Sequence, residues 1–412
     1  MSTGGEQIVK ISGVGRRGDG IATLGEDTIF IPLGLPGETV RVQRTGDRGR
    51  LTQVLQTSSE RAEPFCQYFG RCGGCSLQHW HEANYKAWKR QLLLEALRQR
   101  GIDVDPEPVV DAHGDGRRRV VLHVRHIAGH VQAGFMGART HHLQDIETCP
   151  ILASGLRAAP ELARAIGRVF GPDYKGLDVQ VDGTDGGISC HVRGPRDISL
   201  DLRMDLASLA QEYGLARLTV GSELVVEQRQ PVVLIGQVRV VLPPGGFLQA
   251  TAKGQELLRA LVSTASKGAE TVADLFCGIG PFTFELAGRS AVHAIDGNAA
   301  AILALTTAAR FSQGLRPIRA ETRDLYKRPL SSVDLNRYET VILDPPRAGA
   351  EAQVRELARS TVPKAVSVSC DVNSFARDAA ILIGGGYRLT RIVPIDQFKW
   401  SAHLEVFGLF ER

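Results

Sequence analysis

The stretch that decides the fold runs from Thr271 to Phe282 and reads TVADLFCGIGPF. An apolar run leads into two glycines and then into a helix-like segment, which predicts a strand, a tight turn and a helix. Three more apolar runs follow: AVHAID at 291–296, TVILDPP at 340–346 and AVSVSC at 365–370. Near-continuous apolar strands that alternate with helices are typical of a parallel sheet covered on both faces. We therefore predict a doubly wound α/β domain with its ligand at the carboxyl ends of the strands.

The turn after the first strand has the features of a ligand-binding loop. Gly278 and Gly280 allow a tight turn and a close approach of the backbone to a ligand at the start of the next helix. A dinucleotide-binding loop would have a third glycine at position 283, where this chain has Thr283. Asp296 ends the second strand, where a carboxylate can accept hydrogen bonds from the ribose hydroxyls of an adenosine. Taken alone, the loop is also compatible with an ordinary strand–helix turn.

The predicted strand that begins at residue 340 ends in Asp344-Pro345-Pro346-Arg347. Two prolines stiffen the chain after the strand and hold Asp344 at the mouth of the expected pocket. The order of the glycine loop, Asp296 and Asp344 resembles that of a class I S-adenosylmethionine-dependent methyltransferase. This resemblance implies S-adenosylmethionine as cofactor.

Two further residues carry candidate catalytic chemistry. Cys370 ends the predicted strand at 365–370, directly before a predicted helix. The dipole of that helix favours the thiolate, although a cysteine there is also compatible with simple packing. Glu405 lies in the otherwise apolar closing strand, LEVFGLF. Its carboxylate either faces solvent or points into a pocket, where burial raises its pKa towards that of a general base. A cysteine that adds to a ring carbon needs such a base.

A cysteine cluster precedes the α/β domain. Cys66, Cys72 and Cys75 lie within ten residues that also contain several glycines, and Cys149 is a candidate fourth ligand. This spacing predicts a metal site, and the thiolate set suits either zinc or an iron–sulfur cluster.

The remaining sequence predicts two more domains and a reducing compartment. Short β-branched runs over residues 1–60 predict a small barrel, a helix is expected over 82–100, and strands predominate from 115 to 245. The net charge of +4 permits a nucleic-acid partner without requiring one. Seven cysteines without a secretory signal favour the cytoplasm, and no apolar run is long enough to predict a membrane helix.

The motifs together resemble the RNA uracil-C5 methyltransferase family over essentially the whole chain. They are Cys66-x5-Cys72-Gly73-Gly74-Cys75 with Cys149, Phe247-Leu248-Gln249, DLFCGIG, Asp344-Pro345-Pro346-Arg347, Ser369-Cys370 and His403-Leu404-Glu405. The resemblance implies an N-terminal OB-like barrel of the TRAM type (1–60), an α+β iron–sulfur and RNA-binding domain (61–245) and a class I methyltransferase domain (246–412). It also implies that segment 78–109 packs on the methyltransferase domain.

The resemblance further implies a [4Fe–4S] cluster on the four cysteines, Cys370 as nucleophile and Glu405 as base. The residues that fall at cofactor or pocket positions are Gln249, Phe276, Gly278, Gly280, Pro281, Asp296, Asp324 and Asp344. Four positions depart from the usual family pattern: Thr251 replaces Asn, Asp296 replaces Glu, Lys399 replaces Pro and Ser401 replaces Thr. These departures concern details of the cofactor pocket more than the chemistry.

The expected reaction is methylation of uridine C5 in an RNA, by a monomer, with ribosomal RNA favoured over transfer RNA. Arg117, Arg118 and Arg119 are candidate phosphate contacts, although such a run is as often a solvated basic cluster. Two other classes stay open: a redox protein whose working part is the thiolate cluster, and an RNA-binding protein with a decayed transferase domain.

Overall fold

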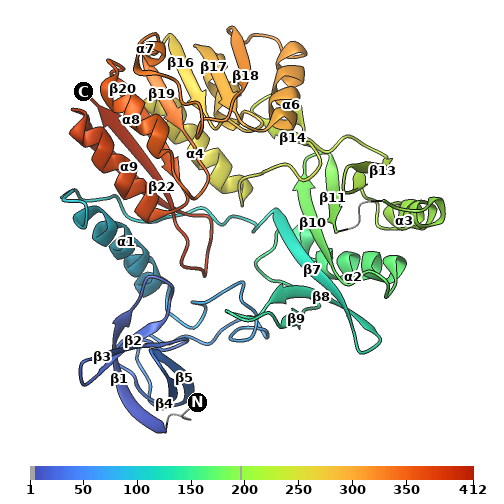
Figure 1. The fold of residues 1–412 in the computed structure, drawn as a ribbon, viewed down its shortest axis with the longest axis vertical. Coiled ribbons are helices and arrows are strands. Elements are labelled where there is room, and N and C mark those ends of the chain that lie inside the picture. Colours follow the sequence, from blue (N-terminus) through green and yellow to red (C-terminus); the bar gives the residue numbers. More distant parts are fainter. Residues whose placement is uncertain (1–4, 195–196) are drawn as a thin grey trace. The chain divides into compact units, whose positions relative to one another are not determined.

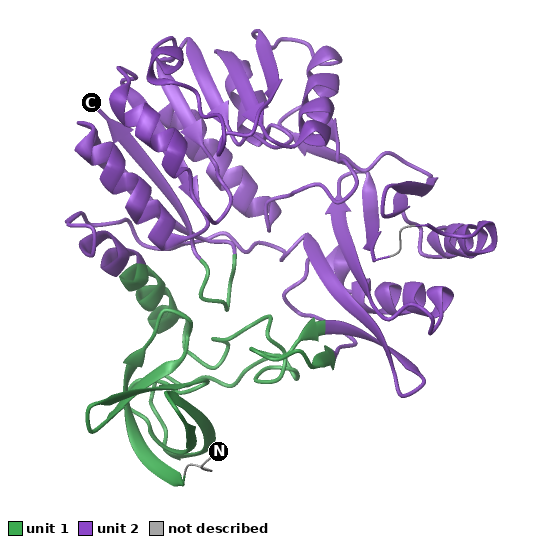
Figure 2. Cartoon of the chain, in the orientation of Figure 1, with its two compact units in different colours: residues 1–92, 135–144, 398–403 green, residues 93–134, 145–397, 404–412 purple. Residues whose placement is uncertain are grey.

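The computed structural model describes residues 5–194 and 197–412, which fold into two compact units (Figure 2). Unit 1 comprises Met1–Leu92, Phe135–Gln144 and Phe398–His403, and unit 2 comprises the remaining residues. Within the described ranges, no helix has the length and apolar character needed to cross a membrane.

Unit 1 contains a closed barrel with the strand order β1-β2-β3-β5-β4 (Figure 1). Its strands are β1 (Glu6–Val14), β2 (Gly20–Leu24), β3 (Asp27–Ile31), β4 (Thr39–Thr45) and β5 (Arg48–Gln56). Alternate residues such as Val9, Ile29 and Val42 fill the barrel interior, as the period of two along each strand requires. The small barrel predicted from the first sixty residues is confirmed.

Unit 2 is built on an eight-stranded sheet with the order β18-β17-β16-β19-β20-β22-β21-β6. Its strands are β16 (Thr271–Leu275), β17 (Ala291–Asp296), β18 (Ile318–Thr322), β19 (Thr340–Leu343), β20 (Lys364–Ser369), β21 (Arg388–Asp396), β22 (Glu405–Glu411) and β6 (Val110–Asp111). Only β22 runs antiparallel to its neighbours in the described sheet. The predicted doubly wound α/β fold is confirmed.

The last two strands of the chain pair with each other. Strand β22 inserts between β20 and β21, and β6 forms the edge of the sheet. Glu405, the first residue of β22, therefore lies inside the sheet.

Helices cover both faces of this sheet. They are α4 (Ala252–Ala265), α5 (Pro281–Ala287), α6 (Ala299–Arg310), α7 (Ser332–Leu335), α8 (Glu351–Arg359) and α9 (Val372–Gly384). Strand residues alternate between two cores: Val341 and Leu343 pack with α8 and α9, whereas Ile342 packs with α4 and α5. This alternation explains why both sides of each strand are apolar in the sequence.

A segment far away in the sequence completes one of these cores. Helix α1 (Glu82–Arg98) lies where the sequence predicted a helix, and its Leu93 and Leu97 are fully buried in the core that contains Leu343. Strand β6 then pairs with β21. Segment 93–111 is thus part of the α/β fold, although it precedes the rest of that fold by about 140 residues of chain.

The central region forms a second sheet with the order β13-β12-β11-β10-β7-β8-β9. Its strands are β7 (Arg119–Ile127), β8 (His130–Met136), β9 (Leu143–Asp145), β10 (Leu177–Thr184), β11 (Gly187–Arg193), β12 (Arg217–Val220) and β13 (Glu223–Glu227). The helices of this region are η1 (Ser154–Leu156) and α2 (Ala159–Phe170), between β9 and β10, and α3 (Leu200–Glu212), between β11 and β12. Strands also occur at 232–241, as expected, but they form a separate antiparallel hairpin, β14 (Val232–Ile235) and β15 (Val238–Val241), which packs with α6.

The packing of α1 on the α/β sheet can be tested by truncating a single side chain. Leu97→Ala should lower the free energy of unfolding of the α/β fold by about 2–5 kcal/mol, because it leaves a cavity in a closed core. Leu303→Ala is the matched control, since Leu303 is 68 % exposed, and it should change stability by less than about 0.5 kcal/mol. Equal midpoints for the two variants in urea unfolding would contradict the described packing.

Candidate active site

The loop after β16 turns through backbone conformations that L side chains rarely adopt. Phe276, Gly278 and Gly280 all have positive φ angles, of 62°, 53° and 89°. A Cβ on Gly280 would lie 2.9 Å from Leu305 Cδ1, so this position requires glycine for space as well as for conformation. The non-glycine Phe276 in this region is a strained position of the kind found at ligand sites.

Asp274 and Thr283 hold this loop together. Thr283 Oγ1 donates to Asp274 Oδ2 (2.6 Å), and both side chains are fully buried. Burial raises the pKa of Asp274 to about 7. Sequence reasoning used Thr283 only to argue against a dinucleotide loop and did not name Asp274 as a site residue. Here the threonine side chain occupies the position of the missing third glycine and fixes the loop through its hydroxyl.

Asp296 lies at the carboxyl end of β17 beside the same loop. Its Oδ2 accepts from Gly278 N (2.9 Å), and its Oδ1 accepts from Asn298 N (2.7 Å). Each carboxylate oxygen can accept a second hydrogen bond. Although an aspartate is shorter than the glutamate of the usual family pattern, Asp296 reaches the glycine loop here, and its oxygens retain the capacity to accept from ribose hydroxyls.

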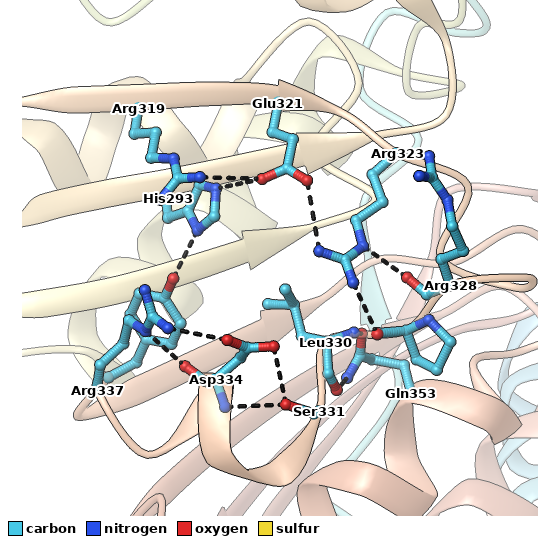
Figure 3. A network of polar contacts seen from close by, with 12 residues as sticks. His293, Arg319, Glu321, Arg323, Arg328, Leu330, Ser331, Asp334, Arg337 and Gln353 are labelled. Carbon is cyan, nitrogen blue, oxygen red and sulfur yellow. Dashed lines mark hydrogen bonds and ion pairs between the residues drawn. The ribbon is translucent and has the colours of Figure 1, made fainter.

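The loop after β18 lies beside Phe276. Asp324 Oδ1 accepts from Tyr326 N (3.0 Å), and the Tyr326 and Phe276 rings lie 5.5 Å apart. A polar network holds this loop, as Figure 3 shows. In it, Arg323 donates to the carbonyl oxygens of Arg328 and Pro329, and the Gln353 amide exchanges two hydrogen bonds with the Leu330 backbone.

Four side chains form a continuous hydrogen-bonded chain at the carboxyl ends of the strands. Gln249 Nε2 donates to Asp344 Oδ2 (3.3 Å), and Gln397 Nε2 donates to Gln249 Oε1 (2.9 Å) and to Glu405 Oε2 (2.6 Å). Burial raises the pKa of Glu405 to about 7, whereas the hydrogen bond from Gln397 opposes this rise. Burial, and next the charge of Glu405, raise the pKa of Asp344 well above its usual range. Glu405 thus points inward, and Gln397 is a residue that sequence reasoning missed.

Cys370 lies between β20 and α9 and is partly buried. Burial, and next the charges of Glu405 and Asp344, raise the pKa of its thiol to about 11, and Arg347 opposes this rise. The expected help from the helix dipole is largely absent, because Asp371 caps α9 and its carboxylate accepts from Asn373 N and Ser374 N. The free protein therefore holds Cys370 as a thiol at neutral pH.

Comparisons with known proteins agree with this geometry. The profile of the tRNA (Uracil-5-)-methyltransferase family matches residues 243–412. An uncharacterised RNA methyltransferase of Brucella suis biovar 1 is 42 % identical over 98 % of this chain and 97 % of its own. The 23S rRNA (uracil(1939)-C(5))-methyltransferase RlmD of Chromohalobacter salexigens is 35 % identical over 93 % of this chain and 85 % of its own.

The chain belongs to the RNA uracil-C5 methyltransferase family. It is therefore an S-adenosylmethionine-dependent enzyme that acts on RNA. A solved structure supports the fold: the tRNA (uracil-54, C5)-methyltransferase of Pyrococcus abyssi, in complex with S-adenosyl-L-homocysteine, has a TM-score of 0.74, with 22 % identity over 98 % of this chain and 99 % of that one.

Two of the three arginines proposed to contact RNA in this methyltransferase have internal side-chain partners. Arg118 donates to the Gln249 carbonyl oxygen (3.2 Å) and to Gln255 Oε1 (2.6 Å), so it holds the segment that carries Gln249. Arg119 lies 3.8 Å from Asp182 and over the Phe247 ring. The run is thus not simply a solvated basic cluster, and RNA contact by Arg117, Arg118 or Arg119 stays a prediction.

The cysteines of the predicted metal site are divided between the two units. Cys66, Cys72 and Cys75 belong to unit 1, whereas Cys149 belongs to unit 2. In the part of the chain that the structure describes, no group of three or more His, Cys, Asp or Glu side chains is arranged to hold a metal ion. The predicted cluster therefore rests on the spacing of the cysteines and on the family resemblance.

The protonation of Cys370 predicts how it reacts with an alkylating agent. With its pKa near 11, alkylation by iodoacetamide should be slow at pH 7 and should rise roughly tenfold per pH unit up to pH 9, because only the thiolate reacts. Peptide mass spectrometry measures the modification at this position and distinguishes it from that at other cysteines. A rate that levels off below pH 8 would contradict the raised pKa.

Proposed function

We propose that this protein methylates C5 of a uridine in 23S ribosomal RNA through a covalent adduct with Cys370. The observation that carries the proposal is the set of groups at the carboxyl ends of β19, β20 and β21. There the Cys370 thiol lies in the field of Asp344 and Glu405, and one hydrogen-bonded chain joins those two carboxyl groups.

In the proposed reaction, the Cys370 thiol gives its proton to water, and the thiolate sulfur bonds to C6 of uracil while the C5=C6 electrons move towards the O4 carbonyl. C5 becomes an enolate-like carbon and takes the methyl group of S-adenosylmethionine, which leaves as S-adenosylhomocysteine. Glu405 then removes the C5 proton, the double bond re-forms and the C6–S bond breaks. Covalent catalysis of this kind divides one difficult step into easier ones.

The protonation states suit this division of roles. The raised pKa of Glu405, about 7, is that of a base which is partly ionised at neutral pH and still accepts a proton readily. The raised pKa of Asp344 favours the protonated form of its carboxyl group, which can donate a hydrogen bond to a pyrimidine carbonyl oxygen. Arg347 is the cationic group that favours the Cys370 thiolate.

We assign the methyl donor to the pocket beside the glycine loop. The residues proposed to hold it are Gln249, Phe276, Gly278, Gly280, Pro281, Asp296, Asp324 and Asp344. The strained turn at Phe276, the acceptors of Asp296 and the pair of rings formed by Phe276 and Tyr326 support this assignment.

The choice of ribosomal over transfer RNA rests on the Chromohalobacter salexigens relative, whose name specifies 23S rRNA. Transfer RNA is the alternative, because the matching family profile and the Pyrococcus abyssi enzyme are named for it. The target uridine must leave its stack to reach Cys370, so we expect a looped or flipped base in either RNA.

Variants of the two catalytic residues test the reaction. With labelled S-adenosylmethionine and total RNA from cells that lack the gene, the wild type should label 23S rRNA and leave tRNA unlabelled. Cys370→Ala should abolish transfer, and Glu405→Gln should accumulate a denaturation-resistant RNA adduct, because its C5 proton cannot be removed. Cys190→Ala is the control, since Cys190 is buried in β11. Full activity of Cys370→Ala would contradict the adduct, and labelling of tRNA alone would establish the alternative substrate.

We also propose a [4Fe–4S] cluster on Cys66, Cys72, Cys75 and Cys149. Protein purified without oxygen should contain about four iron and four sulfide ions per chain. Cys72→Ser should lose most of the iron, whereas Cys190→Ala should retain it. Stoichiometric zinc without iron would instead establish a zinc site, and the absence of both metals would contradict any metal site at these cysteines.

A further inference from the structure

Gln397 is a buried amide that no step of the proposed reaction uses. It directly follows β21 and has no exposed surface. Its Nε2 donates to Glu405 Oε2 at 2.6 Å and to Gln249 Oε1 at 2.9 Å. Both protons of this amide nitrogen are therefore engaged, one by the proposed base and one by the residue that contacts Asp344.

The backbone on either side of Gln397 is fixed by strand pairing. Ile395 pairs with Glu405 across β21 and β22, and Asp396 pairs with Asp111 of β6. Ala112 N also donates to the Asp396 carbonyl oxygen (3.1 Å). Glu405 thus starts β22 opposite Ile395, and Gln397 comes two residues after Ile395, so strand pairing fixes the backbone next to both side chains.

The far side of the amide is confined by α4. A Cβ built on Gly254 would lie 2.7 Å from Gln397 Oε1, so no side chain fits there unless the amide moves. Thr251 caps the same helix turn: its Oγ1 accepts from Gly254 N (2.9 Å) and donates to the Ala112 carbonyl oxygen (2.6 Å). Oε1 of Gln397 has no hydrogen-bond partner among the described residues, so hydrogen bonding of this oxygen does not explain the amide's position.

We propose that Gln397 is a positioning residue for Glu405, which holds the carboxylate towards the C5 proton and joins it to Gln249 and Asp344. This inference rests on the proposed role of Glu405. An ionised carboxylate only accepts hydrogen bonds, so the amide nitrogen is the matching partner on that side. Because the amide is confined between Glu405 and α4, the carboxylate keeps one orientation.

The same contact influences when Glu405 is ionised. The charged or titratable groups near this site are Asp344, Cys370 and Arg347, with Asp274 and Asp296 acting on Asp344. Burial raises the pKa of Glu405 and the Gln397 hydrogen bond lowers it. Removing the donor should therefore raise this pKa further, so that a higher pH is needed before Glu405 can accept the C5 proton.

The test replaces the amide by an uncharged side chain of similar size. In single turnovers with RNA that carries [5-³H]uridine, methyl transfer and tritium release report adduct methylation and C5 proton removal separately. Gln397→Met should transfer the methyl group within about threefold of the wild-type rate, but release tritium at least about tenfold more slowly at pH 7. Its pH midpoint for release should lie above that of the wild type, and a methylated RNA adduct should accumulate.

Two other variants separate positioning from damage to the fold. Gly254→Ala keeps the glutamine at position 397 but adds a Cβ that displaces its amide. It should therefore also slow tritium release, by less than Gln397→Met does. Ser360→Ala removes a buried hydrogen bond before the start of β20, at the opposite end of the sheet, and should alter neither rate. If Gln397→Met does not fold, as judged by its thermal transition, Gly254→Ala provides the test.

The outcomes distinguish this inference from the proposed function. If Glu405→Gln fails to accumulate an adduct, the proposed base is wrong. If Glu405→Gln accumulates an adduct while Gln397→Met, or Gly254→Ala in its place, releases tritium at the wild-type rate with an unchanged pH midpoint, only the positioning role is overturned. Equal slowing of methyl transfer and tritium release in Gln397→Met would likewise contradict it.

Discussion

The active end of this protein depends on keeping carboxyl groups out of water without leaving them unpaired. Asp274 and Glu405 are buried and Asp344 is partly buried at the edge of the sheet where the parallel strands end, and burial raises the pKa of each. Neutral donors, a threonine hydroxyl and two glutamine amides, satisfy them in place of cations. Such donors leave the proton affinity of the carboxyl groups high, whereas an arginine partner would lower it.

The sequence was sufficient to predict the α/β fold, because each central strand is apolar on both sides and ends in a distinctive residue. Asp344 and Glu405 were found through motifs that locate them at strand ends. Gln397 was missed because its role depends on the insertion of β22 between β20 and β21, and strand order is not encoded in a local pattern. The sequence also predicted the strands of the hairpin β14–β15 but not their partners, since alternating valines fit either partner.

The electrostatics of Cys370 were also beyond a local interpretation. Its place before a helix suggested a thiolate, but Asp371 occupies the amides at that helix start and two carboxyl groups face the sulfur. A thiol that stays protonated until the substrate is bound reacts slowly with oxidants and other electrophiles. The reactivity of the Cys370 thiol is thus restricted by the charged groups near the sulfur as well as by its burial.

The inclusion of segment 93–111 in the sheet matters for anyone who divides this chain. A recombinant fragment starting near residue 246 would lack β6 and the second half of α1, and would expose the core around Leu343 to water. The same holds for chimeras between relatives: exchanging the carboxyl-terminal half alone would combine a sheet from one parent with a covering helix from the other. The unit that packs together is discontinuous in the sequence, because residues encoded before the central sheet complete the core of the α/β fold.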